Sequence, residues 1–196
     1  MKKLVALTGK TGAGKSTVSE YLRSKGAFVI DGDVVARDVL KTDFSLLPEL
    51  KRLFGNDIEL NGVLDRKKLA QKAFSTPENT KLLNSVFHPS VNKKIDELVQ
   101  NAFSEYDIVI VDAAAVIESG YSEKCDALIA VTAPFDVRLE RIKMRDGISE
   151  SDALVRMNAQ KDDLFYTKNA DFVIVNDGDF KPGEMLCDVC DYLFGS

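Results

Sequence analysis

The chain has 196 residues, 45% of them hydrophobic, and a formal net charge of −5. This composition is ordinary for a globular protein, and no apolar run approaches the ~20 residues that a membrane-spanning helix needs. The acidic balance disfavours nonspecific binding of nucleic acid through overall charge. We therefore expect a single folded domain with no nucleic-acid and no membrane partner. The first expected strand begins close to residue 1, which leaves no space for a signal peptide and favours the cytoplasm.

The first predicted elements surround a glycine-rich loop. An apolar run at residues 4–8 predicts a buried parallel strand, and residues 18–25 predict a helix that ends at Gly26. Between them, residues 9–16 (GKTGAGKS) match the P-loop pattern G-x-x-x-x-G-K-[ST]. In such a loop, backbone N–H groups and the helix N-terminus bind phosphate oxygens. A chance glycine turn would rarely meet all the fixed positions in this context, so the segment indicates a nucleoside triphosphate site.

The residue types of this loop predict individual roles. Lys15 reaches the β- and γ-phosphates, and the Ser16 hydroxyl group is a ligand for Mg²⁺. The expected nucleotide-binding residues of the loop are Gly9, Thr11, Gly12, Ala13, Gly14, Lys15, Ser16 and Thr17.

A pair of carboxylates follows the second predicted strand, at residues 27–30. If the backbone stays extended, Asp31 and Asp33 point the same way, at the sheet edge where the P-loop also lies. Alternatively, Asp33 caps a helix over residues 34–40. Its position favours catalysis, with Asp33 as the candidate base. Arg37 follows four residues later and faces the same side of that helix.

Residues from about 41 to 106 contain no obvious strand and show the apolar spacing of helices. The expected helices lie at residues 46–54, 66–74, 76–87 and 89–103. Because Pro89 suits the first turn of a helix, His88 is expected at a helix entrance. We interpret the whole segment as a helical insertion that binds the substrate.

The most strand-like run, at residues 106–112, ends in Asp112. A carboxylate at the end of a central parallel strand is a Walker-B-like arrangement that can hold Mg²⁺ directly or through water. Glu118 follows as another carboxylate on the expected ligand side.

A helical hairpin is predicted next. Its first helix carries Arg138, Arg141 and Arg145 near one face. Its second helix starts with Ser149 as N-cap and runs to about residue 160. The arginines could form a solvated basic stripe. A hairpin that carries arginines is also the usual shape of a lid that closes over a triphosphate.

The remaining elements complete the sheet. Residues 127–132 and 171–175 predict the fourth and fifth strands, and residues 182–194 predict a closing helix. A C-x-x-C pair, Cys187 and Cys190, falls within this helix. We interpret it as two buried cysteines one turn apart, because a zinc site needs about four ligands.

The spacing of these segments along nearly the whole chain resembles the dephospho-coenzyme A kinase family. Residues 29–37 (VIDGDVVAR) match its D-x-D-x-x-A-R signature, and residues 141–149 resemble its lid. Further similar stretches lie at residues 5–17, 62–66, 83–89 with its His-Pro, and 170–178. The P-loop alone fits many kinases, whereas this combination is much more specific.

The resemblance implies an α/β fold of the P-loop NTPase type. This is a three-layer sandwich with a five-stranded parallel sheet, a helical substrate subdomain and a helical lid. The implied single kinase domain spans residues 1–196. Its parts are a core at 1–40, 106–135 and 169–196, a coenzyme-binding insertion at about 41–105, and a lid at about 136–168.

The resemblance also implies the reaction. ATP and Mg²⁺ serve to phosphorylate the ribose 3′-hydroxyl group of dephospho-CoA, the last step of coenzyme A synthesis. The implied catalytic residues are Asp33, Lys15, Arg141 and Arg145. Asn176 joins the nucleotide site, and Ser16 and Asp112 hold the metal. The implied substrate-binding residues are Asp31, Arg37, Arg66, His88 and Glu118. The expected form is a monomer or a weak homo-oligomer.

Two positions depart from the family pattern, and two other functions stay open. Ala114-Ala115 replaces a usual Pro-Leu pair, and Tyr166 stands where a basic residue is usual. The alternatives are a kinase for another nucleoside or nucleotide acceptor and a non-enzymatic P-loop switch. The aspartate pair and the arginines of the lid favour transfer to a bound hydroxyl group.

Overall fold

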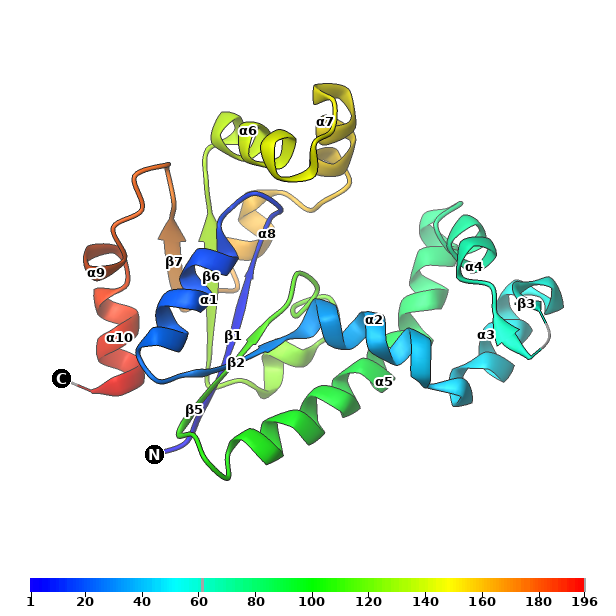
Figure 1. The fold of residues 1–196 in the computed structure, drawn as a ribbon, viewed down its shortest axis with the longest axis horizontal. Helices are drawn as coiled ribbons and strands as arrows, with labels where there is room; N and C mark the ends of the chain where they lie inside the picture. The colour runs from blue at the N-terminus through cyan, green and yellow to red at the C-terminus, as the bar shows by residue number, and fades with distance from the viewer. Residues whose placement is uncertain (61, 196) are drawn as a thin grey trace. The chain divides into compact units, whose positions relative to one another are not determined.

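A computed structural model of the chain describes residues 1–60 and 62–195 (Figure 1). The chain divides into two compact units. The first unit comprises residues 1–33 and 98–196, and the second comprises residues 34–97.

A five-stranded parallel sheet lies in the first unit. The strands, in the order of the sheet, are β2 (Phe28–Asp31), β5 (Ile108–Asp112), β1 (Lys3–Gly9), β6 (Ala127–Thr132) and β7 (Phe172–Val175). Every neighbouring pair is parallel. The predicted α/β class and the five-stranded parallel sheet are therefore confirmed. All five carboxyl ends lie at one edge, where ligands bind in such sheets.

The described residues of the first unit also form six complete helices, of which the first and the last share a buried cluster with the sheet. These helices are α1 (Lys15–Ser24), α6 (Phe135–Asp146), α7 (Glu150–Asn158), α8 (Asp163–Thr167), α9 (Pro182–Met185) and α10 (Cys187–Phe194), with a 3₁₀ turn at Tyr121–Lys124. Alternate residues of β1, Val5 and Leu7, share a buried cluster with Leu22 of α1 and Val189 of α10. Each such side chain contributes about 1.5–3 kcal/mol through its burial, which fixes α1 and hence the start of the P-loop helix.

The helical hairpin forms as predicted, with different ends. Gly147 ends α6 with φ 62°, and the Ser149 side chain caps α7 by accepting from the Asp152 N–H at 3.2 Å. Ile142 and Met157 are buried between the two helices. The second helix ends at Asn158, two residues before the predicted end.

The second unit contains α2 (Gly32–Thr42, which begins in the first unit), α3 (Leu47–Phe54), α4 (Arg66–Ala73) and most of α5 (Pro77–Ala102). Two 3₁₀ turns lie at Phe44–Leu46 and Asn56–Ile58. The expectation of no strand here is wrong, since β3 (Glu59–Leu60) and β4 (Val63–Leu64) form a short antiparallel pair. Two residues per strand are too few to show the alternation on which a strand prediction depends.

Two helix starts differ from the prediction. Pro89 lies inside α5, so His88 is not at a helix entrance. Proline removes one intrahelical hydrogen bond, and a helix of 26 residues retains many others. Asp33 lies in the first turn of α2 and is not its N-cap, because the helix already begins at Gly32. A Cβ atom on Gly32 would lie 2.7 Å from the Cβ atom of Ala113, so glycine allows this tight turn from strand to helix.

The closing helix is divided at Leu186, whose φ of −111° and ψ of 15° separate α9 from α10. Cys187 is consequently the first residue of α10 and is exposed, and Cys190 is half-buried. The prediction of two buried cysteines is therefore wrong. Within residues 1–60 and 62–195, no helix is both long and apolar enough to cross a membrane.

Candidate active site

The P-loop connects β1 to α1 in the first unit. Gly12 and Gly14 adopt positive φ angles of 78° and 95°. Gly14 precedes the first helical residue, Lys15, in a left-handed conformation. The Thr17 N–H donates to the Gly14 carbonyl oxygen at 3.1 Å. The N–H groups that precede it in the first turn of a helix have no intrahelical acceptor, so they can bind an anion.

Replacing Gly14 with alanine is expected to weaken ATP binding and to lower the melting temperature. The new Cβ atom would lie 2.2 Å from Nδ2 of Asn176, on a backbone that alanine rarely adopts. Gly26→Ala is the matched control, because Gly26 also has a positive φ, 103°, but no atom lies within 4 Å of its Cβ position. The control should show only backbone strain of about 1–2 kcal/mol. Calorimetric titration with ATP and thermal unfolding measure the two effects. Unchanged ATP affinity in Gly14→Ala would refute the assignment of this loop as the nucleotide-binding site.

A cavity of about 850 Å³ opens beside the P-loop within the first unit. The predicted residues that line it are Thr11, Gly12, Gly14, Lys15, Ser16, Thr17, Asp31, Asp33, Asp112, Arg141, Arg145 and Asn176. Ala13 is instead buried in the hydrophobic cluster, and Gly9 packs against the backbone of Val131. The cavity therefore joins phosphate-binding groups, carboxylates and lid arginines.

Other lining residues were not predicted. They are Lys10, Ala114, Met144, Gln160 and Phe180. The place of Lys10 inside the P-loop and that of Ala114, two residues after Asp112, could be indicated by the sequence, whereas the other three follow from how the chain folds over the loop.

The three carboxylates interact electrostatically. Asp31 of β2 lies opposite Asp112 of β5 in the sheet register. Burial raises the pKa of Asp112, and the charges of Asp33 and Asp31 raise it further, whereas Lys15 and a hydrogen bond with Ser19 lower it. Because like charges in a partly buried site repel, a bound cation would relieve the repulsion.

The donor set suits Mg²⁺ in the presence of a nucleotide. The Ser16 hydroxyl group and the Asp112 carboxylate line the same cavity. In the part of the chain that the structure describes, no three His, Cys, Asp or Glu residues form a cluster that could hold a metal by themselves. Mg²⁺ commonly binds one or two carboxylates and takes its other ligands from phosphates and water, so these residues fit it.

Asp33 has a fixed orientation at the cavity. Its Oδ1 atom accepts a hydrogen bond from the Ala114 N–H at 3.3 Å. The peptide after β5 therefore orients the carboxylate that follows β2.

Arg141 and Arg145, the two predicted catalytic arginines of α6, both contact the P-loop. Arg141 donates through Nη2 to Oδ1 of Asn176 at 2.8 Å and through Nη1 to the Gly12 carbonyl oxygen at 3.2 Å. Arg145 donates to Oγ1 of Thr11 at 3.4 Å and pairs with Asp146 at 2.7 Å. Asn176 is buried with 2% exposure, so Arg141 joins the loop to the end of β7.

The other predicted substrate-binding residues are not among the described residues that line the cavity beside the P-loop. Arg37 lies on α2, Arg66 begins α4 and His88 lies on α5, all in the second unit. Burial lowers the pKa of His88, which favours its neutral form. Glu118 belongs to the first unit, where burial raises its pKa; the described residues that line the large cavity do not include it.

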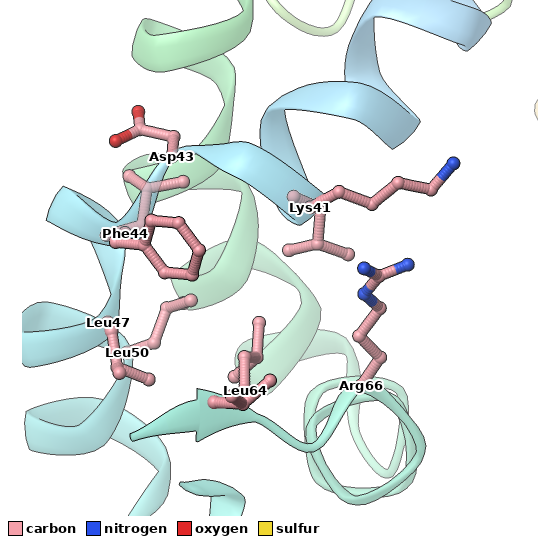
Figure 2. Close-up of a pocket in the computed structure, with 10 residues that line it drawn as sticks. Lys41, Asp43, Phe44, Leu47, Leu50, Leu64 and Arg66 are labelled. Carbon is pink, nitrogen blue, oxygen red and sulfur yellow. The ribbon is translucent and has the colours of Figure 1, made fainter. Parts of the chain in front are cut away.

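Arg66 lines a small cavity of the second unit (Figure 2). The side chains of Arg66 and Lys41 lie on one side, and Phe44 and Leu47 lie on the other. This cavity measures about 30 Å³, which is space for about one water molecule. It is a notch with a cationic side and an opposite side that combines apolar side chains with the Asp43 carboxylate.

The parallel sheet, the P-loop between β1 and α1, and the arginines of the helical hairpin define a P-loop kinase. The family model for dephospho-CoA kinase matches residues 3–182, and a dephospho-CoA kinase from Corynebacterium jeikeium is 38% identical over 175 residues, 89% of this chain and 90% of that protein. The chain belongs to the dephospho-CoA kinase family, whose members are ATP-dependent phosphotransferases.

Solved structures agree with this assignment. A protein from Thermus thermophilus superposes with a TM-score of 0.81 at 33% identity, covering 99% of each chain. Dephospho-CoA kinase from Campylobacter jejuni superposes with a TM-score of 0.70 at 28% identity, covering 100% of this chain and 99% of the other. The likeness therefore extends over both units of the sequence.

Proposed function

We propose that this chain transfers the γ-phosphoryl group of ATP to the ribose 3′-hydroxyl group of dephospho-CoA and so produces coenzyme A. Membership of the family supports the acceptor. The observation that carries the chemistry is the single cavity lined by Lys15, Asp33 and Arg141. A nucleophile, a triphosphate and groups that stabilise charge can meet there.

Asp33 is the proposed base. Its carboxylate faces the cavity and is oriented by the Ala114 N–H. A carboxylate at this place accepts the proton of the attacking hydroxyl group or orients that group for in-line attack. The base thus acts on the acceptor, not on ATP.

Lys15, Arg141 and Arg145 are proposed to stabilise the charge that spreads over the transferred phosphoryl oxygens. Lys15 donates to the Gly9 carbonyl oxygen at 3.2 Å, so its side chain lies over the loop. A guanidinium group has five N–H donors. Arg141 can therefore hold the loop and still donate to a phosphate oxygen.

Ser16 and Asp112 would hold Mg²⁺ in this cavity, directly or through water. The ion would neutralise charge on the β- and γ-phosphate oxygens. The remaining nucleotide contacts are proposed for the loop amides and for Asn176.

The acceptor is proposed to be held by Asp31, Arg37, Arg66, His88 and Glu118. Arginine suits the phosphates of a coenzyme because its planar group donates to two oxygens at once. Neutral His88 can both donate and accept a hydrogen bond. We further propose that residues of about 41–105 form the coenzyme-binding subdomain and that residues of about 136–168 form the lid of one kinase domain.

We also propose that the protein acts in the cytoplasm as a monomer or a weak homo-oligomer, with neither nucleic acid nor membrane as a partner. The net charge of −5 supports the absence of a nucleic-acid partner.

The deciding experiment measures ADP release from ATP and Mg²⁺, with and without dephospho-CoA, together with the mass of the product. We expect ADP only when the acceptor is present, and a product heavier by one phosphoryl group. Chelation of Mg²⁺ with EDTA should abolish the reaction, because the triphosphate charge is then not neutralised.

The alternatives give different results in the same assay. Slow release of ADP without an acceptor, with no gain in mass, would indicate a nucleotide switch. Transfer to adenosine or to a nucleoside monophosphate, and not to dephospho-CoA, would indicate another kinase.

A further inference from the structure

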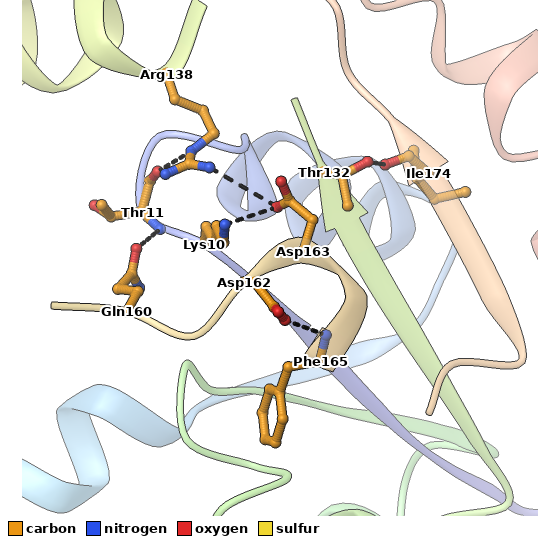
Figure 3. A network of polar contacts seen from close by, with 9 residues as sticks. All are labelled: Lys10, Thr11, Thr132, Arg138, Gln160, Asp162, Asp163, Phe165 and Ile174. Atoms are coloured by element: carbon orange, nitrogen blue, oxygen red, sulfur yellow. Dashed lines mark hydrogen bonds and ion pairs between the residues drawn. The ribbon is translucent and has the colours of Figure 1, made fainter. Parts of the chain in front are cut away.

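Two side chains from opposite ends of the helical hairpin hold one residue of the P-loop (Figure 3). Arg138 of α6 donates through Nε to the Thr11 carbonyl oxygen at 3.1 Å. The Thr11 N–H donates to Oε1 of Gln160, two residues after α7, at 2.9 Å. We call Arg138 and Gln160 the Thr11 clamp.

These contacts determine the direction of the loop amides. A trans peptide points its C=O and N–H groups in opposite directions. Because Arg138 holds the Thr11 carbonyl oxygen, the Gly12 N–H points away from Arg138, and Gly12 lines the cavity. The preceding peptide is also held at both ends, by Gln160 at its N–H and by the Ala13 N–H at the Lys10 carbonyl oxygen, 3.1 Å away.

Arg138 is an unusual residue for a purely structural contact. It is buried with 3% exposure, and its partner Asp163 lies 3.8 Å away and is itself 56% exposed. Asp163 also pairs with Lys10 at 3.1 Å (Figure 3). A buried charge with a distant, shared partner contributes little to the free energy of folding, so stability does not explain why arginine stands here.

The loop and α6 are in close contact at this point. A Cβ atom on Gly12 would lie 2.8 Å from the Arg138 carbonyl oxygen. Gly12 has a positive φ and no side chain to resist a rotation of its peptide groups. Without the clamp, the peptide between Thr11 and Gly12 could rotate and turn its N–H away from the cavity.

We propose that Arg138 and Gln160 are positioning residues that fix the Thr11 peptide groups, so that the Gly12 N–H is directed at the triphosphate before ATP binds. The inference depends on the proposed function only in taking ATP as the ligand. It assigns to the hairpin a second task besides carrying Arg141 and Arg145, namely to preorganise the loop.

The test uses the full chain and compares Arg138→Met and Gln160→Met with Lys143→Met. Methionine keeps much of the volume of each side chain and removes its polar contacts with Thr11. Lys143 also lies on α6, where it pairs with Glu140 at 2.8 Å and Glu150 at 3.1 Å, so its variant loses one positive charge without touching the loop. Binding of a non-hydrolysable ATP analogue with Mg²⁺ is measured by calorimetry without acceptor, and KM is measured for each substrate.

We expect the dissociation constant of the ATP analogue to rise about tenfold in each clamp variant. Without the clamp the Gly12 N–H is no longer directed at the triphosphate, and losing one hydrogen bond of ordinary to charged strength has an effect of this size. The KM for dephospho-CoA should change less than about twofold, and Lys143→Met should resemble the unmodified chain. Arg138→Lys should recover most of the affinity, because its ammonium group can donate to the same carbonyl oxygen. The double variant should lose less affinity than the two single losses added, because both residues hold one loop.

Equal ATP affinity in Gln160→Met and the unmodified chain would overturn the proposal, as would a rise in both KM values alike. If Arg138→Met fails to fold, Arg138→Lys and Gln160→Met decide the matter. The analogue is titrated without acceptor. The comparison of ATP affinities therefore remains valid even if the assigned acceptor is wrong. If the unmodified chain does not bind ATP at all, that result contradicts the proposed function instead.

Discussion

Replacement of Asp33 by asparagine is expected to lower kcat by about 10²- to 10⁴-fold, the range for loss of a general base. Asparagine has nearly the same size, and its side-chain oxygen can still accept from the Ala114 N–H, as Oδ1 of Asp33 does at 3.3 Å. The variant therefore keeps the geometry and removes the proton acceptor. The dissociation constant of MgATP should change less than about threefold.

Asp38→Asn is the matched control. Asp38 also lies on α2, is 61% exposed and pairs with Lys41 at 3.5 Å, so its variant has the same change in net charge away from the cavity. Its kcat should equal that of the unmodified chain. A nearly normal kcat in Asp33→Asn would remove Asp33 from the mechanism. A fall in kcat together with a large loss of MgATP affinity would assign Asp33 to the metal or nucleotide site instead.

The core of the fold could be predicted because its signals are local. Residues 4–8 and 127–132 are apolar runs of strand length, and they form β1 and β6 as expected. Each lies in the middle of a parallel sheet, where burial on both faces produces such runs. The N-cap of α7, Ser149, could also be predicted, because an N-cap depends on a few adjacent residues.

The errors occur where tertiary packing outweighs local preference. Pro89 would start a helix in isolation, but α5 continues through it. The start of α2 at Gly32 depends on close packing against Ala113, which lies 81 residues further along the chain. The division of the last helix depends on Leu186, which is fully buried.

The same distinction applies to the candidate site. Lys15 and Ser16 could be found because the P-loop is a continuous motif, and Asp33 and Asp112 because carboxyl ends of parallel strands share one edge. Gln160 could not be found, because nothing in its neighbours shows that it reaches the Thr11 N–H across 149 positions. Arg138 was visible only as one arginine among three, and its burial distinguishes it from Arg145, whose side chain is 61% exposed.

Replacement of Lys15 by methionine should impair both ATP binding and the rate. Loss of a charged hydrogen bond to a phosphate typically costs about 1.5–3 kcal/mol, so we expect the dissociation constant of MgATP to rise about 10- to 100-fold. A donor to the transferred phosphoryl group contributes more in the transition state than in the ground state, so kcat should also fall by about 10²- to 10³-fold. Calorimetry with the ATP analogue and steady-state kinetics measure the two effects separately.

The control is Lys25→Met, at the other end of the same helix, where Lys25 is the C-cap residue of α1. It removes the same charge and should change neither the dissociation constant of MgATP nor kcat.

Two causes of the losses in Lys15→Met can be separated, namely repulsion among the carboxylates and loss of the direct contact with the phosphoryl group. Lys15 lowers the pKa of Asp112, so its removal strengthens the repulsion among the carboxylates when no cation is bound. If that repulsion were the main effect, raising the Mg²⁺ concentration would restore kcat, whereas direct contact of Lys15 with the phosphoryl group predicts that kcat stays low at every Mg²⁺ concentration.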